Sequence, residues 1–381
     1  MTVQETHTLA RPGLRDAVPF WSPLALIPLV WFAAVTGGVA VLLIPAFTWV
    51  LTGVLDAILG KNRANLDPDT PENSLFWYHL ITVIWPFAQL AVLLGLLAYM
   101  PFAAHLTWVE KIGLFFGMGV VSGTIGIVYA HELMHRPGRA ERRLADLLLA
   151  MVFYGHFRSE HLLVHHRYIG TPRDPVTARF GEGFHRFFAR VLPGCYRSAW
   201  RAEVGMLARK GLSPWNIRNP FWIYHGAQAA FLVVAYALAG WAGVALILFQ
   251  GFIAIWQLEL VNYVEHYGLT RKHLGEGRYE HAQPHHSWNA TQKASNWLLI
   301  NLQRHSDHHT APARPFPLLQ AQDGDAIPQL PRGYPVMTSL AMVPPFWQRV
   351  MNPRVRDWRK RHYPEISDWT PYDKATNPMP R

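Results

Sequence analysis

Long apolar stretches constrain this 381-residue chain more than any other feature. Crossing a bilayer as a helix takes about 20 mainly apolar residues. Six stretches meet this requirement, at about 20–37, 38–59, 79–100, 112–130, 221–240 and 242–263. Glycines join the first stretch to the second and the fifth to the sixth, which predicts two tight hairpins. We therefore expect one all-α membrane domain over residues 1–381, with six transmembrane helices.

The alternative fold, a soluble protein with long buried helices, is disfavoured by the distribution of basic residues. If the N-terminus is cytoplasmic, all of the 35 lysines and arginines except Lys111 fall on the cytoplasmic side. This bias follows the positive-inside rule and places 131–220, 264–381 and both termini in the cytoplasm. A basic face near anionic headgroups also accounts for the net charge of +10. We therefore expect no nucleic-acid partner.

Two further segments affect the topology. The first apolar stretch follows Arg11 and Arg15, as a signal peptide would, but it continues into the second stretch without a small-residue cleavage site. We therefore interpret it as an uncleaved helix. Residues 310–345 contain many prolines, which predicts an extended segment that wraps the cytoplasmic part.

Histidine is abundant and cysteine nearly absent. The single residue Cys195 excludes a disulfide framework, a cysteine-rich zinc module and an iron–sulfur centre. The chain has 20 histidines, and three clusters have the spacing of metal ligands, with His266 as a further candidate. The clusters are His131 with His135, then His161 with His165 and His166, then His305 with His308 and His309.

Helical spacing suggests how these side chains point. Residues four apart share a helix face, so His131 can point with His135, and His161 with His165. Adjacent residues such as His165 and His166 diverge by about 100°, so one helix can serve two metals. By the predicted topology, every cluster lies at the cytoplasmic end of the membrane helices.

The residues leave the kind of metal open. His131-Glu132-x-x-His135 alone matches the zinc-protease pattern, with Glu132 as general base. A single zinc needs four ligands including water, which leaves the clusters at 161–166 and 305–309 unexplained. Imidazole suits iron, copper, zinc and nickel alike, so the clusters predict two metal ions without selecting the element.

Several sequence motifs are more specific than the spacing of the histidines. Asn262-Tyr263-Val264-Glu265-His266-Tyr267-Gly268 and Leu302-Gln303-Arg304-His305-Ser306-Asp307-His308-His309 are the most specific. Further stretches lie at 154–157, 171–175, 278–281 and 284–289. Together they resemble the integral-membrane di-iron alkane 1-monooxygenases, a family within the membrane fatty acid desaturase and hydroxylase superfamily. Met134, Arg136 and Val164 depart from the family pattern, which leaves the substrate preference open.

The resemblance implies an enzyme of the bacterial inner membrane with two non-haem iron ions. It would use O₂ to hydroxylate the terminal methyl of a medium- or long-chain alkane to a primary alcohol. The electrons would come from a rubredoxin, itself reduced by an NAD(P)H-dependent reductase. The implied iron ligands are His131, His135, His161, His165, His166, His266, His305, His308 and His309.

Two alternative activities stay open within the same architecture. One is methyl-aromatic side-chain oxidation of xylene- or cymene-like substrates, and the other is fatty-acyl desaturation or hydroxylation. A membrane zinc protease, and a metal-sequestering or transport protein, are more distant alternatives.

Residues around the ligands complete the predicted site. Ligating histidines generally donate their second N–H to a carboxylate or carbonyl group. The carboxylates next to the ligands in sequence are therefore expected to orient them, and these are Glu132, Glu160, Glu265 and Asp307. His285 and His286 are expected either to support the ligands from behind or to be structural. The candidates for a substrate channel, chosen for their position near the metal end of the helices, are Trp49, Val50, Gly53, Ile125, Ile127 and Trp256.

Overall fold

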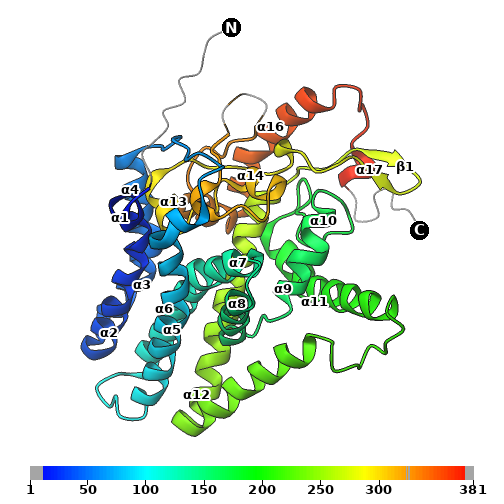
Figure 1. Ribbon diagram of the computed structural model, residues 1–381. Coiled ribbons are helices and arrows are strands. Elements are labelled where there is room, and N and C mark those ends of the chain that lie inside the picture. Colours follow the sequence, from blue (N-terminus) through cyan, green and yellow to red (C-terminus); the bar gives the residue numbers. More distant parts are fainter. Residues whose placement is uncertain (1–11, 323, 325–326, 374–381) are drawn as a thin grey trace.

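The computed structural model describes residues 12–322, 324 and 327–373, and it is mostly helical. Long apolar helices form a bundle, and shorter elements from the second half of the chain gather at one end of it (Figure 1). We call this end the cap, which comprises the described residues from 267 to 373. Residues 1–11 and 374–381, which the sequence assigns to the cytoplasm, lie outside the described residues.

The bundle is built from the first half of the chain together with one later helix. In chain order its elements are α1 (Leu14–Ala17), η1 (Val18–Ala25), α2 (Leu26–Thr36), η2 (Gly38–Leu42), α3 (Leu43–Pro45), η3 (Ala46–Leu51), α4 (Thr52–Leu59), η4 (Glu72–Leu75), α5 (Phe76–Tyr99), α6 (Trp108–Val121), η5 (Ser122–Gly126), α7 (Ile127–His135) and α12 (Phe221–His266). Between α7 and α12 lie α8 (Arg139–Met151), α9 (Phe157–Glu160), η6 (His161–His165), α10 (His166–Tyr168) and α11 (Phe184–Ala208).

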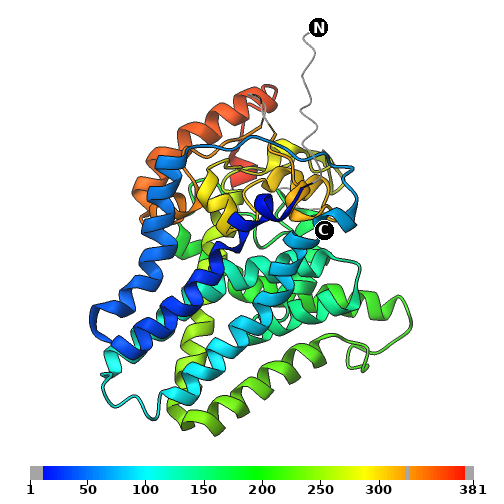
Figure 2. The same ribbon diagram turned by 60° about the vertical axis from the view of Figure 1, so that its left-hand side comes forward.

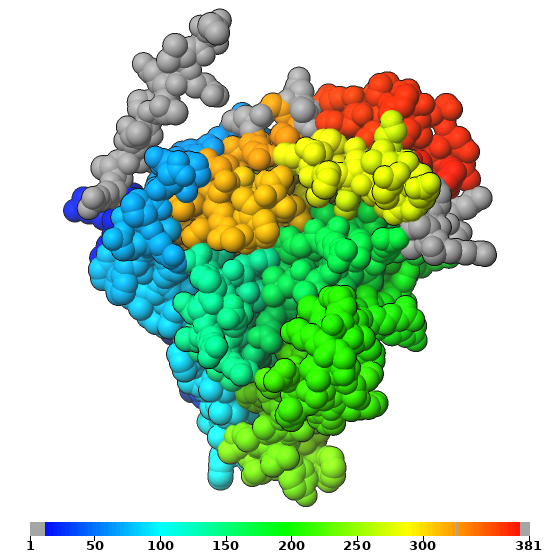
Figure 3. Space-filling model, turned by 45° about the vertical axis from the view of Figure 1, so that its right-hand side comes forward, coloured from blue at the N-terminus to red at the C-terminus, as the bar shows by residue number. Residues whose placement is uncertain are grey.

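The cap contains short helices and one small hairpin. Its elements are β1 (His273–Gly275), β2 (Arg278–Tyr279), η7 (Pro284–His286), α13 (Lys293–Leu298), α14 (His305–Thr310), η8 (Phe316–Leu318), α15 (Tyr334–Ala341), α16 (Pro344–His362) and α17 (Thr370–Asp373). The two strands pair antiparallel. In the space-filling view, the cap residues cover one end of the molecule, opposite the tip formed by α12 (Figure 3).

Five continuous helical segments in the described residues are long and apolar enough to cross a membrane, namely Leu14–Thr36, Gly38–Leu59, Glu72–Tyr99, Trp108–His135 and Phe221–His266. The last has 46 residues and loses helical geometry at Ala239 and Gly240. Its two arms meet at the end of the bundle away from the cap (Figures 1 and 2). This break coincides with the predicted turn between 221–240 and 242–263, so the five segments are compatible with six spans.

The predicted ends of the spans differ from the observed ones. The fourth helix continues beyond residue 130 to His135, and the last continues to His266. Hydropathy recognises only the apolar part of a helix, whereas buried histidines and carboxylates prolong these two helices at the cap end. The first histidine cluster and His266 therefore lie on the membrane helices and not after them.

The first hairpin turns at two glycines, as the sequence predicts. Gly37 and Gly38 have φ values of +66° and +56°, a region that glycine adopts without steric cost. The backbone N–H of Gly38 donates to Glu110, which also caps α6 by accepting from the N–H of Thr107 at 2.7 Å. One carboxylate thus ties the first hairpin to the start of the helix that carries the first histidine cluster.

Glycines also bring α6 and η5 close to α12. A Cβ atom on Gly119 would lie 2.6 Å from Cβ of Ile253, and one on Gly123 would lie 2.6 Å from the carbonyl oxygen of Ala254. Small residues allow such backbone approach between membrane helices. This packing sets the spacing between α7 and the end of α12, which both carry histidines of the site.

The proline-rich segment agrees only partly with its prediction. It is largely irregular between α14 and α15, where the backbone N–H of Phe316 donates to Glu132 and that of Gln320 donates to Asp307. It is helical, however, over Tyr334–Ala341 and from Pro344 onward. Proline is tolerated in the first turn of a helix, because a backbone N–H at that place has no hydrogen-bond partner within the helix. Pro335 and Pro344 lie in the first turns of their helices.

We predict that Gly119→Ala destabilises the bundle, because its methyl group would enter the space of Ile253 and Gln250. The midpoint of thermal unfolding in detergent should fall by several degrees. Gly226→Ala is the matched control, since a Cβ there meets nothing within 4 Å and alanine favours a helix over glycine. Equal behaviour of the two variants would contradict the close-packing explanation.

Candidate metal centre

The nine predicted ligands reach one region from five elements. The first cluster lies on α7, His266 ends α12, and the third cluster lies on α14. The second cluster spans the π-helical turn η6 and the start of α10. Four stretches that are distant in sequence therefore converge where the bundle meets the cap.

The structure divides the nine side chains into two groups. In each group the potential ligand atoms all lie within 4.8 Å of one another. The five-histidine group comprises His131, His135, His161, His166 and His308, and the four-histidine group comprises His165, His266, His305 and His309. This is the arrangement expected for two metal ions.

The pairing within the second cluster differs from the prediction. His161 joins His166, five residues later, and His165 belongs to the other group. The cause is the π-helical turn, in which hydrogen bonds run from i to i+5, so that residues five apart share a face. The expected divergence of His165 and His166 is confirmed, and the pairing of His131 with His135 follows the ordinary helical spacing.

The distances between imidazole nitrogens fit metal coordination. The Nε2–Nε2 separations are 3.0 Å for His135–His161, 2.9 Å for His161–His166, 3.1 Å for His166–His308, 3.1 Å for His266–His305 and 3.0 Å for His305–His309. Two ligands bonded at about 2.1 Å and separated by 90° lie about 3.0 Å apart, whereas tetrahedral angles give about 3.4 Å. These separations are therefore short enough for the paired imidazoles to share one ion.

The protonation states also suit metal ligation. Burial, with a further contribution from neighbouring imidazoles, lowers the pKa of five ligands outside the membrane helices well below the ordinary histidine value. These are His161, His166, His305, His308 and His309. Neutral imidazole is the form that binds metals, so these five side chains do not have to lose a proton when a metal ion binds.

Asp174 orients one ligand and was missed by the sequence prediction. Its Oδ2 accepts from Nδ1 of His165 at 3.0 Å and from the hydroxyl of Thr177 at 2.8 Å, and its Oδ1 accepts from the N–H of Val176 at 3.0 Å. A proton held on Nδ1 leaves the lone pair of Nε2 free for a metal. The motif at 171–175 contributes to the family resemblance, but no spacing rule connects it to His165.

The four predicted carboxylates have different surroundings. Oε1 of Glu265 lies 3.3 Å from Nδ1 of His305 and accepts from the hydroxyl of Tyr334 at 2.9 Å. Glu132 and Asp307 are bonded to the proline-rich segment, as described above, and not to an imidazole. Glu160 is fully buried, and neither of its carboxylate oxygens has a hydrogen-bond partner among the described residues. Burial, together with Asp174 and Glu259, raises its pKa well above the ordinary value.

A third cluster is held together by hydrogen bonds. Glu280, His285 and His286 also have ligand-type atoms within 4.8 Å of one another. The N–H of Gln283, however, donates to Nδ1 of His286 at 2.8 Å, so the proton of that ring must lie on Nε2. This Nε2 is 2.7 Å from the hydroxyl of Tyr363, which donates to Glu280. With both nitrogens of His286 engaged, this arrangement does not fit a metal site.

An apolar pocket touches both histidine groups. It has about 20 Å³ of free space, roughly that of one water. Three predicted ligands line it, namely His131 and His161 of the five-histidine group and His305 of the four-histidine group. Aliphatic residues of α7 and α12 complete the wall, among them Ile127, Leu258 and Val261. Of the predicted channel residues, Ile127 lines this pocket and Ile125 is buried nearby in η5. The family departures Met134, Arg136 and Val164 do not line it.

The remaining channel candidates do not line this pocket. The rings of Trp49 and Trp256 pack edge to face, with centroids 6.3 Å apart, and Nε1 of Trp49 donates to Gln257 at 3.3 Å. Gly53 faces α15. Val50 is 63% exposed on the outside of the bundle, so the structure does not bring it to an enclosed channel.

The bundle and its buried histidines define a class, the integral-membrane metal proteins whose helices supply imidazole ligands. Residues 106–341 match the family model described as fatty acid desaturase. The chain is 38% identical over 324 residues to alkane 1-monooxygenase 2 of Pseudomonas aeruginosa, covering 84% of this chain and 85% of that protein. It is 36% identical over 347 residues to alkane 1-monooxygenase of Pseudomonas putida, covering 89% and 84%.

A more distant match is the xylene/toluene monooxygenase hydroxylase component of Pseudomonas putida, 29% identical over 329 residues and covering 83% of each chain. The chain therefore belongs to the fatty acid desaturase family and, within it, to the alkane 1-monooxygenases. This confirms the family resemblance inferred from the motifs.

We predict that Asp174→Asn lowers metal affinity by about 10- to 100-fold, the usual effect of losing a partner that orients a ligand. Asparagine has one acceptor oxygen in place of two, so it cannot accept hydrogen bonds both from the N–H of Val176 and from Nδ1 of His165 as the two carboxylate oxygens do. Metal titration of the purified protein measures the change. Asp307→Asn is the control, because Asp307 adjoins a ligand in sequence but contacts no imidazole, and a loss of equal size there would contradict the role of Asp174.

Proposed function

We propose that this protein is a di-iron, O₂-dependent monooxygenase that hydroxylates the terminal methyl of alkanes to primary alcohols. The observation that carries the proposal is the apolar pocket lined by ligands of both histidine groups. The names of the relatives at 36–38% identity support alkanes as the substrate class. The overall reaction would be O₂ + RH + 2e⁻ + 2H⁺ → ROH + H₂O.

Iron is supported by the donor set and its geometry. Nine imidazoles lie in groups of five and four, and in each group the ligand atoms lie within 4.8 Å of one another, so the set can hold two ions. Imidazole is a ligand that iron accepts. When bound, the two irons would supply the activation of O₂ and the oxidation of the C–H bond.

The chain's own residues would bind the substrate and keep water out. An alkane has no polar group, so its binding depends on burial, worth about 0.8 kcal/mol for each CH₂. Ile127, Leu258 and Val261 offer an apolar wall beside the ligands, and the free space, roughly that of one water, would admit only the terminal methyl of an alkane. Asp174 accepts a hydrogen bond from Nδ1 of His165, which leaves Nε2 of that ring free to bind a metal. Enclosure of this kind limits side reactions of a strong oxidant.

The electrons would come from a separate protein. The only cysteine, Cys195, is free and buried, so this chain cannot hold the cysteine-ligated iron of an electron carrier. We infer that a rubredoxin, reduced by an NAD(P)H-dependent reductase, supplies them. The distribution of basic residues supports a multi-pass topology in the bacterial inner membrane with the cap and both termini in the cytoplasm.

We predict that His308→Ala abolishes octane hydroxylation, with a loss of at least about 100-fold, and lowers iron content while the protein stays in the membrane. Removing one ligand of the five-histidine group leaves that ion under-coordinated. His225→Ala, an exposed histidine of α12 outside both groups, is the control and should keep full activity. Full activity of the His308 variant would overturn the ligand assignment.

Product analysis separates the two substrate classes. With added rubredoxin and reductase, we expect 1-octanol from octane and two irons per chain by metal analysis. A related chain at 29% identity is named for xylene and toluene, so xylene is the informative competitor. Exclusive benzylic oxidation would replace the alkane proposal with the methyl-aromatic one, and one zinc without iron would rule out the oxygenase.

A further inference from the structure

One amide side chain lies in the wall of the apolar pocket beside the histidine groups. Leu258, Val261, Asn262 and Glu265 line this pocket from α12. They are spaced three or four residues apart, so they share one face of the helix. Asn262 is only 7% exposed, and the proposed reaction has not yet used it.

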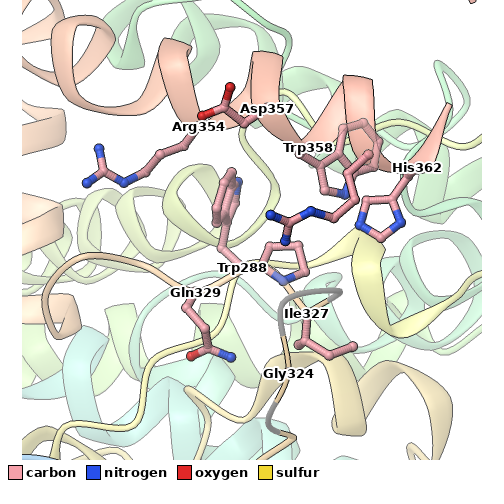
Figure 4. A pocket seen from close by; sticks show the side chains of 10 residues that line it. Trp288, Gly324, Ile327, Gln329, Arg354, Asp357, Trp358 and His362 are labelled. Carbon is pink, nitrogen blue, oxygen red and sulfur yellow. The ribbon is translucent and has the colours of Figure 1, made fainter. Parts of the chain in front are cut away.

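A larger pocket in the cap is not connected with the ligands in this way. Trp288, Arg354 and Trp358 line it, and none of the nine predicted ligands is among the described residues of its wall (Figure 4). A product formed at the metal centre therefore meets the apolar pocket and its Asn262 side chain first.

A chain of hydrogen bonds holds the Asn262 side chain in place. Its Nδ2 donates to Oε2 of Glu259 at 3.1 Å, and Oε1 of the same carboxylate accepts from the hydroxyl of Tyr154 at 2.9 Å. Glu259 is fully buried and Tyr154 is 3% exposed. Rotation of the amide would break its bond to Glu259, so Oδ1 is the amide atom that stays available to a ligand.

Oδ1 of Asn262 accepts no hydrogen bond from the described residues. The other polar groups of the pocket wall are engaged, since Glu265 accepts from Tyr334 and the three histidines belong to the metal groups. A buried carbonyl oxygen without a donor is unfavourable. An alkane cannot change this, because it has no donor, whereas the O–H of an alcohol can donate to the oxygen.

We propose that Asn262 is a product-binding residue, whose Oδ1 accepts a hydrogen bond from the hydroxyl of the primary alcohol formed in the pocket. The free space of about 20 Å³ is that of one water-sized group, which suits a hydroxyl at the end of a chain. Glu259 and Tyr154 are positioning residues that fix the amide. The proposal rests on the proposed function, which supplies the alcohol. It also gives a role to Tyr154, whose motif the proposed reaction does not otherwise use.

The test measures binding without turnover, on the full-length, metal-loaded protein in nanodiscs and without a reductant. Radiolabelled octane or 1-octanol is distributed between nanodiscs with protein and empty nanodiscs of the same lipid, which corrects for the solubility of each ligand in lipid. Asn262→Leu should lower the affinity for 1-octanol by about two- to tenfold, the usual effect of one neutral hydrogen bond, and leave that for octane unchanged. The probe 1-fluorooctane cannot donate a hydrogen bond and should behave like octane.

Val261→Ala is the matched control, because Val261 lines the same pocket and offers only apolar contact. It should weaken the binding of octane and of 1-octanol by the same factor. Tyr154→Phe tests the positioning role, since it removes the hydroxyl that holds Glu259 and leaves the Asn262 side chain in place. It should lower the affinity for 1-octanol alone, by about twofold.

Equal changes for octane and 1-octanol in Asn262→Leu would show that the product site is wrong. If that variant does not fold, equal changes in Tyr154→Phe decide in the same way. If 1-octanol binding depends on Asn262 but no form of the protein oxidises octane, the alcohol site stands and the proposed function fails. If octane is hydroxylated and the ratio of the two affinities is the same in all variants, only the product site fails.

Discussion

Holding nine imidazole rings in two groups, in each of which the potential ligand atoms lie within 4.8 Å of one another, is the constraint on which the rest of the structure depends. The rings are buried, and burial lowers the pKa of those outside the membrane helices, which keeps them neutral. Ordering nine side chains in one place costs conformational entropy, so the helix packing and the cap must keep the rings in place. The glycine contacts between α6 and α12 and the turn at Gly37 therefore serve the geometry of the site as well as stability.

The cap completes what the membrane helices begin. The α7 and α12 helices bring His131, His135 and His266 to the end of the bundle, and α14 adds the third cluster from above. The proline-rich segment then covers the site, since its backbone bonds to Glu132 and Asp307. The aliphatic pocket lies beside both histidine groups, between α7 and α12.

The fold was largely predictable because its main signal is local. Apolar runs of about 20 residues and the glycines between them can be read directly from the order of residues. The ends of the helices were less predictable, because hydropathy does not register buried histidines that prolong a helix, as at His135 and His266. The helix α15, which has Pro335 in its first turn, was likewise not predicted, because a proline-rich composition indicates an extended chain.

For the site, the sequence by itself determined which histidines are available, and its motifs identified the family. Only the tertiary structure decided their division into five and four, the pairing of His161 with His166 and the role of Asp174. The physical reason is that spacing rules assume one helical period, whereas a π-helical turn changes that period and does not show in residue types. The hydrogen bond from the backbone N–H of Trp288 to the carbonyl oxygen of Glu265 joins two different segments of the chain. No helical spacing rule relates such segments, so only their packing in the folded protein determines the contact.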